Sequence, residues 1–262
     1  MLRSLYTAAT GMKANQLYID NISNNLSNVN TSAFKKSRLE FEDLMYQTLV
    51  EPSGGTTDGA TSPSGLQVGL GVRNSSNQKI FAQGSLLETK SPLDLAIQGS
   101  GLIQVQLPGG DMAYTRDGSL KIGSDGSLVT SQGFAIEPSI VIPEGSKEIG
   151  IDASGKVSVL LNDSGVAEEI GQLELVKFIN EGGLKSIGQN LYQSTSATGD
   201  PEIGIPGENG LGTIAQGFME ASNVEMVEEM VGMILAQRAY EISAKAIQTS
   251  DSMLQMANQL KS

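Results

Sequence analysis

The sequence of 262 residues contains no cysteine, no histidine and no tryptophan, and aromatic residues make up only 5% of it. A zinc site of the usual kind, a cysteine nucleophile, a Ser-His-Asp triad and an imidazole general base all require cysteine or histidine. The sequence therefore excludes these chemistries. An enzyme built on it would have to use carboxylates, lysine or tyrosine.

Signatures of nucleotide and calcium binding are also missing. The Gly-x-Gly sequences at residues 69–71 and 99–101 lack the third glycine of a dinucleotide fingerprint, and no GxxxxGK sequence is present. Acidic residues do not alternate as they do in a calcium-binding loop. We therefore expect no cofactor and no metal ion.

Carboxylates leave one enzymatic alternative, a carboxylate-dependent peptidoglycan hydrolase. Its candidates, Asp117 and Asp125, each precede a glycine between short apolar segments. Aspartate in that context is a common turn former. Because turn formation explains both residues, and because the chain offers no tryptophan as a platform for sugars, we expect a protein that is not an enzyme.

Basic residues are few, 17 against 29 acidic ones, so the formal net charge is −12. An acidic surface disfavours nucleic acid and anionic membranes as partners. No apolar run approaches the roughly 20 residues of a membrane-spanning helix, and the N-terminal segment lacks the apolar block of a secretory signal. In residues 1–40, however, five basic residues outnumber two acidic ones, so this end could attract the acidic remainder of another copy.

Apolar residues recur at spacings of three and four at both ends of the chain, as they do in coiled-coil helices. The first predicted helix ends near residue 30, in an asparagine-rich run, with Lys35, Lys36 and Arg38 near the negative end of its dipole. The second is a rod of roughly 35 residues that begins with a capping box of Ser222 and Glu225. The predicted seams are Leu2, Leu5, Ala9, Met12, Ile19 and Leu26 in the first helix and Val227, Val231, Leu235, Ala239, Ile242, Ala246, Met253, Met256 and Leu260 in the second.

Between these helices, short apolar segments separated by Asp-Gly and Ser-Gly turns predict β-strands. The fold class is therefore α+β, and if the N- and C-terminal helices pair, an all-β domain is inserted in mid-chain. We assign residues 1–45 and 218–262 to the helical domain and residues 72–217 to the β domain. Residues 46–71 are assigned to an extended connecting segment rich in glycine, serine, threonine and proline.

The two seams are long for a single pair of helices. If they packed only on each other, much apolar surface would remain in water. Burial between subunits is therefore favoured over burial within one chain. A repeated head-to-tail contact that does not close produces a filament.

Two blocks near the ends of the chain closely resemble the N- and C-terminal signatures of flagellar basal-body rod and hook proteins: NNLSNVNTSAFKKSRLEFEDLMYQ and EASNVEMVEEMVGMILAQRAYEISAKAIQTSDSMLQMANQL. The segments PSGLQVGLGV, QGSLLETKSPLDLAIQGSGLIQV and YTRDGSL resemble the distal-rod members of this family. One departure is Leu102-Ile103, where the family commonly has a Phe-Phe pair, and both positions stay apolar. The N-terminal signature is carried by Asn24, Asn25, Leu26, Asn28, Val29, Phe34 and Lys35.

The resemblance implies a structural subunit of the flagellar distal rod whose terminal helices pair as a coiled coil and line the inner tube. It implies a homo-oligomeric helical tube, in the rod that spans the periplasm, which transmits torque to the hook and forms part of the export channel. A proximal rod or hook subunit is the alternative within the family. The implied partners are the proximal rod proteins, the hook protein, the P-ring and L-ring proteins and the flagellar type III export apparatus, with no nucleic acid and no membrane insertion.

Residues 52–65 read PSGGTTDGATSPSG, a composition that by itself favours a flexible linker. The resemblance favours a different role, because distal rod proteins differ from the flexible hook in this region. It implies that the segment stiffens the tube. The residues expected to do so are Pro52, Gly54, Gly55, Asp58, Pro63 and Gly65.

Overall fold

The computed structural model describes residues 2–51, 64–161 and 167–259. These residues form two units. Unit 1 comprises Met1–Leu26, Ser37–Gln78 and Met226–Ser262, and unit 2 comprises Ser27–Lys36 and Lys79–Glu225. Both ends of the chain therefore belong to unit 1.

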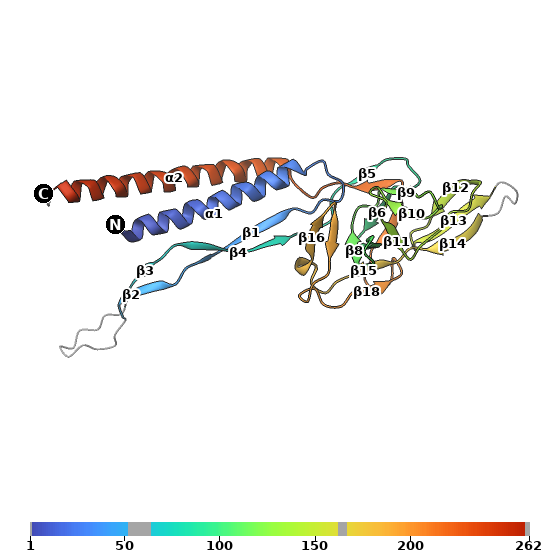
Figure 1. Ribbon diagram of the computed structural model, residues 1–262, viewed down its shortest axis with the longest axis horizontal. Coiled ribbons are helices and arrows are strands. Elements are labelled where there is room, and N and C mark those ends of the chain that lie inside the picture. Colours follow the sequence, from blue (N-terminus) through green and yellow to red (C-terminus); the bar gives the residue numbers. More distant parts are fainter. Residues whose placement is uncertain (1, 52–63, 162–166, 260–262) are drawn as a thin grey trace. The chain divides into compact units, whose positions relative to one another are not determined.

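Unit 1 contains two long helices, α1 (Leu2–Ser27) and α2 (Met226–Gln259), which run side by side (Figure 1). A helix at each end of the chain was predicted and is confirmed. The predicted start of α2 is wrong, because the helix begins four residues after Ser222 and the capping box does not form its first turn. Within the described ranges, neither helix is long and apolar enough to cross a membrane.

A β-ribbon completes unit 1. Strand β1 (Ser37–Asp43) pairs with β4 (Val72–Lys79), and β2 (Tyr46–Val50) pairs in antiparallel fashion with β3 (Leu66–Gly69). The ribbon extends in the same general direction as the helices (Figure 1). Two strands thus form within residues 46–71.

In its described residues, unit 2 consists of β-strands and one short 3-10 helix, η1 (Glu181–Gly183), which confirms the prediction of β structure in mid-chain. Its largest sheet has the strand order β16-β17-β8-β7-β11-β10-β9, and β12-β13-β14 form a second sheet. Three further pairs are β5 with β20, β6 with β19 and β15 with β18, and every one of these pairings is antiparallel. The bounds are β5 (Leu86–Glu88), β6 (Leu95–Gln98), β7 (Ile103–Gln106), β8 (Met112–Thr115), β9 (Leu120–Ile122), β10 (Leu128–Thr130), β11 (Ala135–Glu137), β12 (Ser146–Ile151), β13 (Lys156–Leu161), β14 (Ala167–Gln172), β15 (Leu175–Lys177), β16 (Lys185–Gly188), β17 (Leu191–Gln193), β18 (Glu202–Gly204), β19 (Thr213–Gln216) and β20 (Phe218–Glu220).

Alternation along the strands builds the core of unit 2. In β7, Ile103 and Val105 are buried, whereas the glutamine after each of them is not. Side chains of a strand point to opposite faces of the sheet, so such segments bury one face and leave the other in water. Most buried apolar side chains of the seven-stranded sheet and its neighbours form one core cluster, and a second, smaller cluster contains Tyr114 of β8 and Tyr192 of β17.

The aspartates that could have served a hydrolase form turns. The carboxylate of Asp117 accepts hydrogen bonds from the backbone N–H and the hydroxyl of Ser119, at 3.1 and 2.9 Å. That of Asp125 accepts from the hydroxyl of Ser127 at 2.7 Å, and Gly126 between them has a left-handed φ of 81°. The interpretation of both residues as turn formers is confirmed.

Candidate assembly site

The helices of unit 1 contact each other through polar groups near both ends of α1. The hydroxyl oxygens of Ser4 and Ser250 lie 3.3 Å apart. At the other end, the Asn25 amide donates a hydrogen bond to the Glu229 carboxylate at 3.2 Å. The first residues of α1 therefore lie beside the last turns of α2, and the two helices are antiparallel.

Between these two polar contacts, glycines lie where α1 and α2 approach each other. Gly11 on α1 faces Ser243 on α2, and a Cβ placed on Gly232 of α2 would lie 3.3 Å from the Ile22 Cδ1 atom of α1. Small residues therefore stand at these two points of the contact between the helices.

The predicted seam of α2 lies on other positions of that helix and is largely exposed. Val227 is 74% exposed and Ile242 is 67% exposed, and Ala239 is half-buried. Leu260 lies outside the described residues. The exposed members of this seam, which we call the outer stripe, are Val227, Val231, Leu235, Ile242, Ala246, Met253 and Met256.

The predicted seam of α1 is partly covered. Its members Leu5, Met12, Ile19 and Leu26 are half-buried and Ala9 is exposed, while the side chain of Leu2 lies outside the described part of the chain. The apolar side chains of α1 that are fully buried are Ala14 and Ile22, which lie outside that seam. Within one chain, then, most of the predicted seam residues keep at least part of their surface free for further contacts.

Asparagines of the N-terminal signature have a role that the sequence did not indicate. Asn24 and Asn25 lie inside α1 and do not end it. The Asn25 amide donates to the Ser37 carbonyl at 2.9 Å, and its oxygen accepts from the Ser37 N–H at 2.9 Å. Asn21 donates to the same carbonyl at 2.8 Å. These side chains thus supply the hydrogen bonds that the first residue of β1 would otherwise lack.

A buried ion cluster lies in unit 2. The Lys35 ammonium lies 2.6 Å from one oxygen of Glu220, and the Arg116 guanidinium lies 2.7 Å from the other. All three side chains are at most 4% exposed. The prediction that Lys35 lies near the end of the first helix as a dipole partner is therefore wrong, because its charge is paired in the interior.

Backbone groups complete the coordination of the cluster. Arg116 donates to the carbonyls of Ile97, Gly99 and Gly101 at 2.6 to 2.9 Å. Lys35 also donates to the Ala82 carbonyl at 2.7 Å. Buried charges are tolerated when their hydrogen-bonding capacity is met in this way. The cluster consequently fixes the relative positions of segments far apart in the sequence.

The environment of Glu220 keeps it ionised. Burial acts against the charged carboxylate, but the charge and hydrogen bond of Arg116, the hydrogen bond of Lys35 and the N–H of Gly84 outweigh it and hold the pKa of Glu220 below its usual value. A buried carboxylate between two cations is a structural anchor. It has no free proton acceptor to offer to a substrate.

Another asparagine, Asn223, bonds to the backbone beside the ion cluster. It accepts a hydrogen bond from the Lys36 N–H at 2.7 Å and donates to the carbonyls of Ile80 and Ala82 at 2.8 and 3.0 Å. Sequence reasoning missed Arg116, Glu220 and Asn223. No spacing pattern links them, since they act on segments that only the fold brings together.

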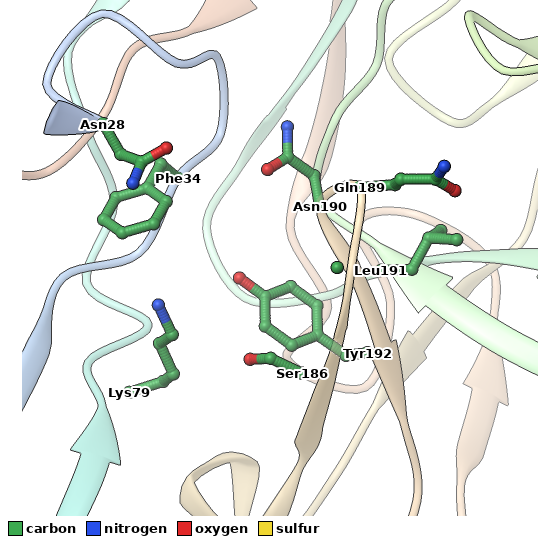
Figure 2. A pocket seen from close by; sticks show the side chains of 9 residues that line it. Asn28, Phe34, Lys79, Ser186, Gln189, Asn190, Leu191 and Tyr192 are labelled. Carbon is green, nitrogen blue, oxygen red and sulfur yellow. The ribbon is translucent and has the colours of Figure 1, made fainter. Parts of the chain in front are cut away.

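A pocket of about 170 Å³ in unit 2 is lined by signature residues Asn28 and Phe34 (Figure 2). The Lys79 ammonium lies 4.2 Å from the centre of the Phe34 ring and donates to the Lys35 carbonyl at 2.9 Å. Across the pocket, burial and the charge of Glu220 raise the pKa of Tyr192 to about 12. The lysine is thus engaged and the tyrosine protonated at neutral pH, and the described lining residues of the pocket pair no nucleophile with a base.

The remaining predicted residues are placed as follows. Val29 is half-buried in the turn after α1, and Gly65 precedes β3. The other residues of the stiffening segment, Pro52, Gly54, Gly55, Asp58 and Pro63, lie outside the described residues.

Three family models match the chain. "Flagella basal body rod protein" matches residues 5–35, "Flagellar hook protein FlgE/F/G D1 domain" matches residues 96–159, and "Flagellar basal body rod FlgEFG protein C-terminal" matches residues 215–260. The flagellar basal-body rod protein FlgG of Borreliella burgdorferi is 51% identical over 100% of this chain and 99% of its own. The FlgG protein of Caulobacter vibrioides is 46% identical over the full length of both. The chain belongs to the flagellar basal-body rod and hook family.

A solved relative, the Helicobacter pylori flagellar hook protein FlgE2, is 15% identical and superposes with a TM-score of 0.25 over 71% of this chain and 56% of its own, which is too low to inform the fold. Members of the rod and hook family are structural flagellar proteins. Family membership therefore confirms that the chain is not an enzyme, and the hydrolase alternative is wrong.

The ion cluster joins the three matched segments. Each matched segment of the rod and hook family contributes one of its charged residues: Lys35 from the first, Arg116 from the second and Glu220 from the third. The three segments therefore meet at one buried point within unit 2.

Proposed function

We propose that the chain is a structural subunit of the flagellar distal rod and assembles with copies of itself into a rigid helical tube. The full-length likeness to proteins named FlgG supports a rod subunit over a hook subunit. The observation that carries self-assembly is the outer stripe of α2, a row of mostly large apolar side chains that nothing in the described chain covers. Contiguous apolar surface of this kind marks an interface.

The tube would place the helices of unit 1 in its packed interior, where coiled-coil contacts between subunits cover the outer stripe. The same helices would line the export channel. Torque passes along the tube from motor to hook, through contacts with the proximal rod proteins at one end and the hook protein at the other. The P-ring and L-ring proteins surround this rod in the periplasm, and the type III export apparatus delivers its subunits.

The decisive experiment introduces a charge into the outer stripe. Leu235→Asp should abolish assembly, because an unpaired buried carboxylate costs several kcal/mol in every subunit. Gln237→Asp, which adds the same charge to an exposed position outside the stripe, is the matched control. Electron microscopy of isolated basal bodies reports assembly, and hydrogen exchange of unit 2 reports its fold. Normal rods built from the Leu235→Asp variant would contradict the proposal.

The stiffening role of residues 52–65 needs its own test. Replacing residues 52–64 by a Gly-Ser chain of equal length keeps its reach and removes its sequence. We expect polymers of this variant to bend in electron micrographs. If they stay as straight as unmodified ones, the segment is only a spacer.

A further inference from the structure

The pocket of Figure 2 lies wholly within unit 2. Asn28, Phe34 and Lys79 line one side of it, and residues 186–192, from the hairpin of β16 and β17, line the other. Its volume of about 170 Å³ is below the roughly 300–1,000 Å³ of pockets that hold drug-sized molecules. The pocket is therefore of a size for a very small molecule or for a single side chain.

The two sides of the pocket are held together by Asn190. Its side-chain amide donates a hydrogen bond to the Ser32 carbonyl at 3.1 Å, which joins the hairpin to the segment that carries Phe34. Its backbone carbonyl accepts a hydrogen bond from the Thr115 hydroxyl of β8 at 2.9 Å. The pocket is thus formed before any ligand arrives, which lowers the cost of binding.

The Tyr192 hydroxyl is a polar group that the described chain leaves unused. The side chain is 4% exposed, and its ring packs edge-to-face on Phe81 with the ring centres 5.1 Å apart. Within the described residues, burial and the charge of Glu220 act on the hydroxyl and no hydrogen bond does. The hydroxyl is also not among the side-chain atoms that the described chain shields completely. A ligand in the pocket can therefore reach it.

The positive charge of the pocket comes from Lys79. An ammonium has three N–H donors, so its bond to the Lys35 carbonyl leaves two of them. Among the described residues no carboxylate pairs with Lys79, and no acidic residue is found in the described lining. Burial accordingly lowers the pKa of the Lys79 ammonium below its ordinary value. The pocket holds a cation that lacks a counter-charge.

Hydrogen-bond donors and apolar surface meet in this pocket. The ammonium of Lys79 and the hydroxyls of Tyr192 and Ser186 are directed toward the same space (Figure 2). The rings of Phe34 and Tyr192 add apolar walls. A carboxylate accepts hydrogen bonds from such donors, and a short aliphatic stem matches the rings. Lys79 is the one cation of the described lining, so a singly charged group matches the pocket better than a phosphate, which carries more charge.

We propose that this pocket binds a carboxylate carried on a short aliphatic stem. In the bound state, the Lys79 ammonium and the hydroxyls of Tyr192 and Ser186 donate to the carboxylate oxygens, and the stem lies against the two rings. Small aliphatic acids offer such a group, and so do the aspartate and glutamate side chains of a second copy of the chain. The site is complete in one subunit, so the inference goes beyond the proposed function and does not depend on it.

Butyrate titrated into the dilute subunit tests the site, with butyramide as its uncharged analogue. At constant ionic strength, butyrate should shift the amide NMR resonances of residues 186–192 saturably, and butyramide should not. Lys79→Met and Tyr192→Phe should each weaken butyrate binding roughly tenfold, because hydrogen bonds to a charged acceptor are strong. Lys185→Met removes an exposed lysine of β16 that does not line the pocket, so this matched control should bind as the parent chain does.

Stability measurements separate binding from folding. Because the Tyr192 hydroxyl has no partner in the described chain, Tyr192→Phe should leave the urea midpoint at neutral pH unchanged. A clear fall of that midpoint would show that the hydroxyl is bonded within the chain and would overturn the site. Equal shifts from butyrate and butyramide, or full affinity for butyrate in Lys79→Met, would overturn it as well.

Assembly distinguishes the two sources of the carboxylate. If the pocket receives an acidic side chain of a second copy, butyrate should inhibit polymerisation, and Lys79→Met should raise the critical concentration while Lys185→Met leaves it unchanged. If the pocket holds a small acid, both variants should polymerise normally and the parent polymer should still bind butyrate. A parent chain that binds butyrate but forms no polymer under any condition would contradict the proposed function and leave the site standing.

Discussion

The two units of this chain differ in how complete they are as isolated structures. Unit 2 buries two apolar core clusters and a fully paired ion cluster. Unit 1 buries few apolar side chains, Ala14, Ile22 and Ala236 among them, and exposes ten large ones on α2 alone. A protein that worked as a monomer would gain nothing from such exposure. The core of unit 2 is thus complete within one chain, whereas the proposed assembly would cover the exposed apolar side chains of unit 1 with those of neighbouring subunits.

The polar contacts of the two units differ in the same way. The ion pairs of unit 1 that the structure describes, Arg38 with Glu40, Arg73 with Glu42 and Arg238 with Glu241, all lie at the surface. Exposed pairs of this kind contribute little because water screens them. In unit 2, removing one charged residue of the buried ion cluster would leave the others buried without their full set of partners.

The largest effect is therefore expected for Glu220→Gln. The change leaves Lys35 and Arg116 buried without their counter-charge and should lower the free energy of unfolding of unit 2 by about 3–5 kcal/mol. Urea denaturation followed by circular dichroism measures this loss of stability, and hydrogen exchange localises it to unit 2. Glu42→Gln in unit 1 is the matched control, with little change expected.

The pH dependence of this effect has a defined sign. The pKa of Glu220 is lowered in the folded state, so its stabilisation is present above the ordinary carboxyl pKa and is lost as pH falls through the folded value. Unfolding curves of the parent chain and Glu220→Gln should converge in acid. Equal stability of the two at neutral pH would show that the cluster does not hold unit 2 together.

A leucine truncation in each unit gives the next largest contrast. Leu128 is 1% exposed in the core of unit 2, so Leu128→Ala should cost about 2–5 kcal/mol through lost burial and a cavity. Leu235 is 64% exposed in the free subunit. Leu235→Ala should change monomer stability little and raise the critical concentration for assembly. A large loss of monomer stability from Leu235→Ala would mean that unit 1 has a core of its own.

Tyr192 offers a smaller, pH-dependent probe of unit 2. Its pKa is raised to about 12, against roughly 10 in an unfolded chain, so the fold favours the protonated phenol. Its contribution is complete below pH 10 and is lost as pH rises from 10 to 12, a loss of about 2–3 kcal/mol. Comparing the alkaline unfolding of the parent chain with that of Tyr192→Phe across this pH range isolates the contribution of Tyr192. Parallel curves would contradict the burial of Tyr192.

The sequence predicted what repeats locally and missed what depends on distant segments. The spacing of Leu5, Met12 and Ile19 indicated a helix, and the Asp-Gly context of Asp117 indicated a turn, because both signals lie within a few neighbouring residues. The pairing of Lys35 with Glu220 joins residues 185 positions apart. Nothing in a local pattern distinguishes such a lysine from one on a solvated surface.

Asparagine shows the same limit within the candidate site. Asn25 was interpreted as part of a helix-ending run because asparagine favours turns. In the structure it continues α1 and bonds to the backbone of Ser37, twelve residues later. A preference for turns is weaker than two hydrogen bonds to an otherwise unpaired strand end.

The smallest expected effect tests whether the helices of unit 1 contact each other in the free subunit. Replacing a helical glycine by alanine stabilises a helix by up to about 1 kcal/mol. At Gly11 the added Cβ meets only an ordinary contact, 3.5 Å from the Ser243 hydroxyl, so Gly11→Ala should keep most of that gain. At Gly232 it would lie 3.3 Å from the Ile22 Cδ1 atom, which must give way, so Gly232→Ala should gain less. Helical content during thermal unfolding of the dilute subunit, measured by circular dichroism, compares the two. If both variants gain equally, the helices are apart in the monomer and pair only on assembly, which would make unit 1 still more dependent on its neighbours than its exposed stripe implies.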